Sequence, residues 1–149
     1  MSALYQFSIR DAELAKCDDF FVKSVFDASL PYLESIGSLA QWGSTPFSQR
    51  PGWVEDTQQQ IQESERNRLA GTTDALRILI VEAELAEQAV AALDLKDMHS
   101  RVSDDGRHFV SVGFAFLRGN WFPKYLPVAI VPQIGQYNTC NHVHLCMPS

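Results

Sequence analysis

The sequence predicts one α+β domain in which two helices precede most strands of a mixed or antiparallel sheet. Tyr5, Phe7 and Ile9 alternate with polar residues, which is typical of a strand with one buried face. Residues 76–81 form an apolar, β-branched run that indicates a central strand, and Ser103 to Gly106 supply the turn of a hairpin. The resulting order is strand, helix, helix, strand, strand, strand, which is an α+β pattern.

A helix is expected directly after the first strand, with Asp11 as its N-cap. Its apolar face is marked by residues at spacings of three to five: Leu14, Cys17, Phe20 or Phe21, Val25 and Leu30. Cys17 therefore reads as a small core residue. Pro31 interrupts the pattern, so that residues 32–36 continue the helix after a kink and Gly37 ends it in a left-handed conformation.

The second helix is predicted to begin near Pro51 and to end at Gly71. One of its sides is apolar: Trp53, Val54, Ile61 and Leu69. Residues 83–95 favour a helix by composition and an extended connection by position, and both interpretations stay open. The hairpin has arms at 96–102 and 107–117.

The second arm alternates strictly, which predicts two distinct faces. One face carries Phe109, Ser111, Gly113 and Ala115, and the other carries His108, Val110, Val112, Phe114 and Phe116. Small residues on one face leave room for a helix or a ligand.

Composition narrows the classes of function. The chain has 149 residues, 18 acidic against 12 basic, and a formal charge of −6 without a basic run, so no nucleic-acid partner is expected. No stretch resembles a membrane span or a signal peptide, so no membrane partner is expected. Three cysteines are too few for a disulfide scaffold, and reduced thiols and a cytoplasmic location are expected.

Three segments carry a resemblance to a known family. They are residues 28–33, residues 36–48 and residues 119–125, and the second reads Ile-Gly-Ser-x-x-Gln-Trp-Gly-x-x-Pro-Phe. The sequence thereby resembles fungal members of the GNAT superfamily of N-acetyltransferases. The resemblance divides the chain into a GNAT-like N-terminal portion, residues 1–137, and an unassigned tail, residues 138–149.

The resemblance implies a partial GNAT-like fold and acetyl-CoA as co-substrate. The family binds the pantetheine arm along a fourth strand, which falls here at about Tyr137, and the pyrophosphate at a glycine-containing turn that begins a helix. The sequence does not contain this turn, because Gly119 and Gly135 stand sixteen positions apart. Either the chain is a truncated or mis-spliced acetyltransferase, or it is a shortened domain that has lost the cofactor half and binds its ligand without acetylating it.

Candidate site residues follow from the resemblance and from chemistry. Acetyl transfer to an amine needs a base and a donor to the developing oxyanion. Glu82 and Glu84, at the end of the apolar strand, are the candidate bases, and Tyr125 is the candidate acid. The alternative for both glutamates is a solvated strand end.

Candidate substrate-binding residues lie in the two loop segments of the resemblance: Gln41, Trp42, Phe47, Trp121 and Phe122. Their aromatic rings would form the wall of a pocket for an aryl or alkyl amine. The alternative is that they cover the core beneath their loops.

The tail places Cys140, His142, His144 and Cys146 at intervals of two. These are zinc ligand types, but on an extended strand the outer two would lie about 20 Å apart, and no metal is expected.

Two functions are therefore open. The chain is an acyl-CoA-dependent N-acyltransferase for a small amine, as in fungal secondary metabolism. Alternatively, it is a non-catalytic small-molecule-binding or accessory domain, which could form a homodimer through an exposed sheet edge.

Overall fold

The computed structural model of the chain describes residues 5–72, 75–118 and 142–146. The strands are β1 (Tyr5–Asp11), β2 (Arg77–Leu85), β3 (Ser100–Val102), β4 (His108–Arg118) and β5 (His142–Cys146). The helices are α1 (Asp18–Ser35), α2 (Leu39–Trp42), α3 (Trp53–Ala70) and α4 (Glu87–Ala92), with 3₁₀ turns η1 (Leu14–Lys16) and η2 (Phe47–Gln49). The predicted α+β class is confirmed.

The described strands form one antiparallel sheet in the order β1-β2-β4-β3. The strand β5 also pairs with β4, along residues 114–118, whereas β3 pairs with residues 108–110. β2 is therefore a central strand, as the apolar run predicted. Five residues of the tail 138–149, which had no assigned structure, form β5. Tyr137 lies outside the described residues.

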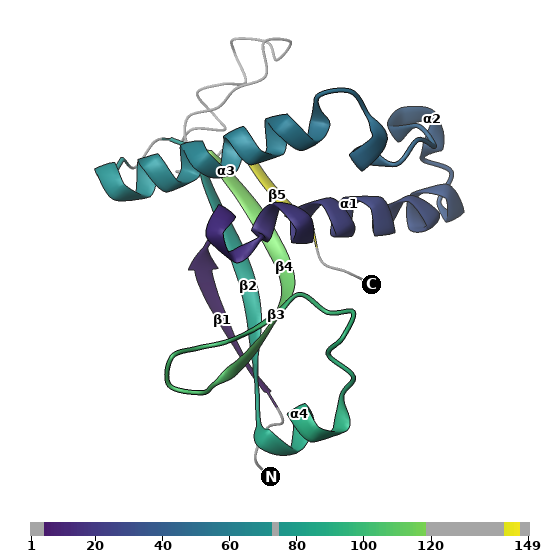
Figure 1. The fold of residues 1–149 in the computed structure, drawn as a ribbon. Helices are drawn as coiled ribbons and strands as arrows, with labels where there is room; N and C mark the ends of the chain where they lie inside the picture. Colours follow the sequence, from purple (N-terminus) through teal and green to yellow (C-terminus); the bar gives the residue numbers. More distant parts are fainter. Residues whose placement is uncertain (1–4, 73–74, 119–141, 147–149) are drawn as a thin grey trace, which may run out of the picture.

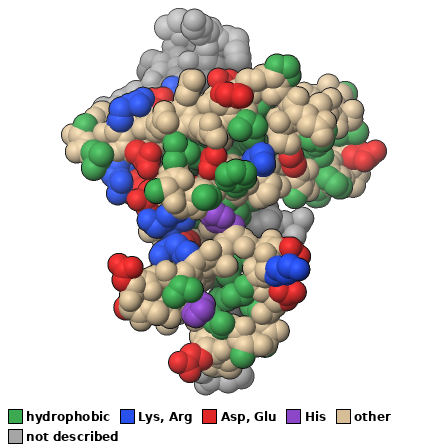
Figure 2. All heavy atoms as spheres, viewed as in Figure 1, with side chains coloured by type: hydrophobic (Ala, Val, Ile, Leu, Met, Phe, Trp, Pro, Cys, Tyr) green, Lys and Arg blue, Asp and Glu red, His purple; other side chains and the backbone are tan. Residues whose placement is uncertain are grey.

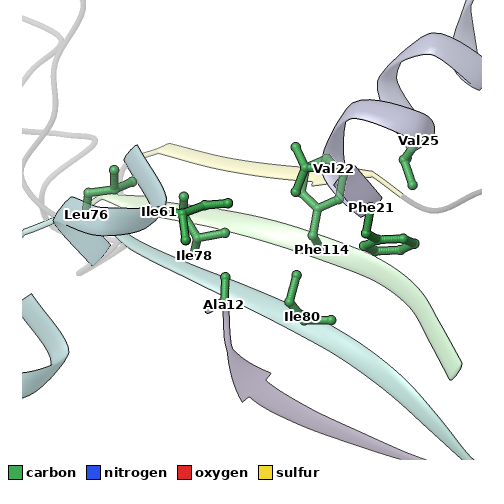
Figure 3. Close-up of a cluster of buried hydrophobic side chains, with 9 residues drawn as sticks. All are labelled: Ala12, Phe21, Val22, Val25, Ile61, Leu76, Ile78, Ile80 and Phe114. Carbon is green, nitrogen blue, oxygen red and sulfur yellow. The ribbon is translucent and has the colours of Figure 1, made fainter. Parts of the chain in front are cut away.

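The helices α1 and α3 lie over the same face of the sheet (Figure 1). The core fills the space between these helices and strands β2 and β4 (Figure 3). Its buried members are Ala12, Phe21, Val22, Val25, Ile61, Leu76, Ile78, Ile80 and Phe114. Two side chains of α3 also bind the start of β2: Ser64 Oγ accepts from the Ile78 amide at 2.8 Å, and Asn67 Nδ2 donates to the Leu76 carbonyl at 2.9 Å.

The face of β1 that packs against the core is not the apolar face that the sequence predicted. Phe7 and Ile9 are 63% and 67% exposed, so the prediction that they form a buried face is wrong. Arg10 pairs with Ile80 across the β1–β2 ladder, and the Ala12 amide donates to the Ile78 carbonyl. The inner face of β1 thus carries a charged residue, which needs ionic partners to be buried.

The first helix begins seven residues later than its predicted N-cap. Asp11 ends β1, where its carboxylate pairs with Arg77, so the capping prediction is wrong. The intervening residues form η1 and a left-handed residue, Cys17, at φ 57°. Cys17 is exposed, and the prediction that it belongs to the core is wrong.

The two predicted helix ends are confirmed. Pro31 lies inside α1, which continues to Ser35 as one helix, and Gly37 follows at φ 75°. Gly71 caps α3 at φ 67°, where its missing side chain permits a left-handed conformation. Leu69, however, is 80% exposed, so its assignment to the apolar side is wrong.

Residues 83–95 contain both an extended segment and a helix, which are the two alternatives that the sequence left open. The strand β2 extends to Leu85, and the short helix α4 follows it. The predicted hairpin is confirmed, since the Ser103 amide donates to the Arg107 carbonyl and the Gly106 amide to the Ser103 carbonyl. Its first arm is shorter than predicted and is reduced to β3.

A β-bulge interrupts the alternation of β4. Val81 pairs with Gly113 and Glu82 pairs with Ser111, so β4 carries one extra residue, Val112, at this point. The strict two-face prediction for residues 108–116 is therefore wrong. Phe114 packs among the core side chains, and beyond the bulge Ser111 lines the same pocket as Glu82.

None of the helices in the described ranges has both the length and the apolar character that crossing a membrane requires.

We expect Ile61→Ala to lower the free energy of unfolding by about 2–5 kcal/mol, because it leaves a cavity in the core. Ile61 is fully buried in the middle of α3. Urea unfolding followed by far-UV circular dichroism measures the change. Leu69→Ala, on the exposed side of the same helix, is the matched control and should change stability by less than about 0.5 kcal/mol. Equal losses for the two variants would contradict this packing of α3.

Candidate functional site

A polar pocket of about 450 Å³ lies where η1 and the ends of β1 and β2 meet the β3–β4 hairpin, and we call it the hairpin pocket. Its lining residues are Arg10, Ala15, Lys16, Glu82, His99, Ser100, Arg101, Val102, Ser103, Asp104 and Ser111. Figure 2 shows basic side chains, with a histidine near them, gathered between the helical layer and the hairpin. The pocket has a volume suited to a small molecule.

Glu82 provides the acidic centre of the hairpin pocket and is only 2% exposed. Arg101 donates to it from two nitrogens, Nε to Oε2 and Nη2 to Oε1, each at 2.8 Å. Arg10 Nε lies 3.0 Å from Oε2. Burial by itself would raise the pKa of Glu82, but the contacts with Arg101 and Arg10 outweigh it and lower that pKa. The carboxylate therefore stays ionised.

Asp18 is the second buried carboxylate and is fully enclosed. Arg10 donates to it through Nη1 at 2.6 Å and Nη2 at 2.8 Å, and the Glu13 amide donates at 2.7 Å. His99 Nε2 lies 3.2 Å from its Oδ1. Burial would raise the pKa of Asp18, yet the hydrogen bonds from Arg10, His99 and Glu13 lower it to about 2.

These four charged residues form what we call the ion-pair chain: Asp18, Arg10, Glu82 and Arg101. It joins α1, β1, β2 and β3, since each residue comes from a different element. The hairpin is held further because His99 stacks on Phe21, with ring centroids 5.5 Å apart. The floor of the hairpin pocket is therefore fixed by contacts from several parts of the chain.

The guanidinium of Arg101 is also fixed in orientation. Its Cζ lies 4.3 Å from the ring centroid of Phe109, in a cation–π contact. The side chain nevertheless remains 30% exposed and lines the pocket. Arg101 is thus held rigidly while part of it is accessible.

The structure brings one of the predicted catalytic residues, Glu82, into the pocket. Glu84 does not line it, and its carboxylate lies 3.6 Å from Arg107 Nη1. Tyr125 lies outside the described residues. Glu82 is ion-paired to two arginines and its pKa is lowered, whereas an efficient base has a pKa near the working pH. Its contacts suit an anchor for arginine better than a proton acceptor.

The predicted substrate-binding residues that are described lie in the loop between α1 and α3. Phe47 is buried, with its ring 5.0 Å from Phe26 and 5.9 Å from Trp53. Trp42 and Gln41 are exposed in α2, and Trp42 contacts Phe47 at 6.4 Å. None of the three lines the hairpin pocket, and Phe47 covers the core, which was the alternative for these aromatics.

The remaining predicted substrate-binding residues, Trp121 and Phe122, lie outside the described part of the chain. In the part that is described, no group of three His, Cys, Asp or Glu residues could hold a metal ion. Of the tail residues weighed as zinc ligands, Cys140 also lies outside it.

Sequence reasoning missed most of the hairpin pocket. Arg10 was one of the polar residues that alternate with the apolar ones of the first predicted strand, and Asp18 lay inside the first predicted helix without an assigned role. One signal was present, because Arg10 and Asp18 are opposite charges eight positions apart across a strand-to-helix turn. Arg101 and His99 are brought in by the long connection between β2 and β3, which no local pattern indicates.

No protein-family model, curated protein or solved structure matches this chain.

We expect the stability of the protein to fall in acid through Asp18. Its pKa is about 2 in the folded state and about 3.9 in the unfolded chain, so its contribution is present above about pH 4 and is lost as the pH falls toward 2. This difference corresponds to about 2–3 kcal/mol. Urea unfolding at steps from pH 6 to pH 2 should show this loss in the wild type and a shallower decline in Asp18→Asn.

Asp19→Asn is the matched control, because Asp19 follows Asp18 in α1 and, among the described residues, accepts only from Gln58 at 3.0 Å. It should retain the acid decline of the wild type. At pH 7, Asp18→Asn should itself be destabilised by about 3–5 kcal/mol, since Arg10 loses a buried partner. An undiminished acid decline in Asp18→Asn would show that another group is responsible.

Proposed function

We propose that this chain is a GNAT-like domain that binds a small polar molecule in the hairpin pocket without acetylating it. The observation that supports this is the pocket itself, about 450 Å³, which is lined by three members of the ion-pair chain, Arg10, Glu82 and Arg101. Buried charges are expensive unless they are paired, and here each buried charge has a partner. A preorganised polar floor of this kind fixes the orientation of a ligand.

Binding is favoured over catalysis by the state of Glu82. Its carboxylate, the candidate base that reaches the pocket, is already engaged by Arg101 and Arg10. Removing a proton from a substrate ammonium would require Glu82 to become protonated and to weaken both pairs. The ion pairs therefore oppose the proton transfer that acetylation needs.

Acetyl-CoA would need a helix start whose free amide groups hold its pyrophosphate, as the GNAT resemblance implies. Among the described residues, α1 begins with Asp18 and Asp19, and α3 has Glu55 and Asp56 in its first turn. These carboxylates compete for the amide groups of the helix start and repel a phosphate group. The described helix starts therefore do not suit the cofactor, and the turn that the resemblance implies, after about Tyr137, lies outside the described residues.

A second candidate, an acyl-CoA-dependent N-acyltransferase for a small amine, is supported by one observation. Two helices cover one face of an antiparallel sheet, in the element order that the GNAT resemblance implies. A cytoplasmic location belongs to both candidates and is supported by the free thiol of Cys17. A homodimer through an exposed sheet edge is also proposed. Its candidate edge is β1, since β1 pairs only with β2 among the described strands.

The two candidates are separated by isothermal titration calorimetry with acetyl-CoA and with CoA. We expect no binding tighter than about 100 μM, because such affinity needs roughly 5.5 kcal/mol of organised contacts. Tighter binding of acetyl-CoA would favour the acyltransferase and contradict the binding-only proposal.

Binding in the hairpin pocket is tested with a panel of small polar molecules by thermal shift. Ala15 is an exposed pocket residue outside the ion-pair chain, so Ala15→Trp should obstruct the pocket without breaking it. Compounds that raise the melting temperature of the wild type should lose that effect in Ala15→Trp. Ala28→Trp, at an exposed position of α1 away from the pocket, is the control and should keep it. Compounds that still bind Ala15→Trp normally would refute the pocket as the site.

A further inference from the structure

The ion-pair chain ends at the hairpin pocket with part of an arginine unpaired. Asp18 binds Arg10, Arg10 also reaches Glu82, and Glu82 binds Arg101. The charges thus alternate from the interior outward: negative, positive, negative, positive. Arg10 lies between two carboxylates, whereas Arg101 has one carboxylate partner among the described residues.

The pairing of Arg101 leaves a defined group of donors available. Its Nε and Nη2 are used on Glu82, so Nη1 and the second hydrogen of Nη2 form a free edge. Within the described ranges, no acceptor contacts Nη1. Because Phe109 and Glu82 fix the plane of the guanidinium, this edge is oriented before any ligand arrives.

The buried carboxylates of the ion-pair chain offer little to a ligand. Both oxygens of Glu82 accept from Arg101, and both oxygens of Asp18 accept from Arg10. Asp18 does not line the pocket and Glu82 is only 2% exposed, so a ligand amine has little access to either. The described floor therefore presents donors rather than acceptors.

The charged residues in the lining of the pocket also favour donors over acceptors. Its lining contains three basic residues, Arg10, Lys16 and Arg101, and two acidic ones, Glu82 and Asp104, in a chain of net charge −6. The hydroxyl of Ser111, on a buried residue, adds a neutral donor to the same lining. Arg10 and Lys16 are themselves paired with Asp18 and Glu13, so the donors that the lining leaves for a ligand come chiefly from Arg101 and Ser111.

We propose that the hairpin pocket recognises a small organic carboxylate, which binds the free edge of Arg101. A planar guanidinium edge matches a carboxylate through two parallel hydrogen bonds. The ligand would give Arg101 a second carboxylate and so repeat the arrangement already present at Arg10. This inference rests on the proposed function, because it names the class of ligand for the same pocket.

The size of the pocket restricts the ligand further. A volume of about 450 Å³ takes a molecule such as an aromatic acid or a short dicarboxylic acid. Asp104, at an exposed position, is the one acidic lining residue without an ion-pair partner among the described residues, and it disfavours a second anionic group nearby. Monocarboxylates are therefore expected to bind better than dicarboxylates.

The test compares acids with their neutral amides of almost equal shape by calorimetry and ligand-observed NMR. The probes are benzoate against benzamide, glutarate against glutaramide, and inorganic phosphate. Benzoate should bind at least about tenfold more tightly than benzamide, since the amide cannot accept both guanidinium hydrogen bonds. Phosphate binding as tight as that of benzoate would overturn the choice of a carboxylate.

The anchoring residue is tested with Arg101→Gln and Arg101→Lys, using benzoate as the probe. Arg101→Gln should lose at least about tenfold in affinity, and Arg101→Lys, which keeps the charge but not the planar edge, should lose part of it. Arg107→Gln is the matched control, because Arg107 belongs to the same hairpin, also lies over Phe109 at 5.5 Å and does not line the pocket. It should bind benzoate as the wild type does. Arg101→Lys keeps the test interpretable if Arg101→Gln unfolds.

The outcomes separate this inference from the proposed function. If amides bind as well as acids and Ala15→Trp blocks both, the pocket binds small molecules but the carboxylate inference is wrong. If neither acids nor amides bind at millimolar concentration, the carboxylate inference is wrong, whereas the proposed function fails only if no compound of the thermal-shift panel binds the wild type. Benzoate binding that is equal in the wild type and Arg101→Lys would remove Arg101 as the anchor.

Discussion

The burial of two carboxylates is the constraint on which the arrangement of this domain depends. Asp18 and Glu82 are almost completely enclosed, and each would be strongly destabilising without a cation. Arg10 contacts both, which fixes the end of β1 against the start of α1 and the middle of β2. Such a network contributes little net stability compared with an apolar core, but it penalises any arrangement that separates its members. We therefore interpret it as specifying how these elements meet.

The bulge in β4 divides the covered face of the sheet into two regions. On one side, Ile78, Ile80 and Phe114 pack under α1 and α3 as an apolar core. On the other side, Glu82 and Ser111 face the hairpin pocket. In a regular strand without the bulge, Phe114 and Ser111 would lie on opposite faces, because they stand three positions apart. The bulge thus lets one strand supply both the core and the pocket.

Local patterns in the sequence predicted the elements but not their burial. The turn at Ser103 to Gly106, the helix end at Gly71 and the central position of β2 depend on short-range chemistry, and all three were predictable. The alternation of β1 defines two faces without saying which one is buried. Arg10 lies inward because Asp18 and Glu82 are there to pair with it, and Glu82 is 72 positions away in the chain.

The chemistry of the candidate site also depends on residues that are distant in the sequence. Glu82 was a candidate base in the sequence, but its chemical state depends on neighbours that no local pattern supplies. A glutamate beside solvent could accept a proton, whereas one between Arg10 and Arg101 holds cations in place and has a lowered pKa. The same pairs that suppress proton transfer keep Arg101 oriented with one edge free. Glu82 keeps Arg101 oriented toward an anion only while its carboxylate is ionised, whereas a base must take up a proton. The ion pairs of this pocket favour the first role.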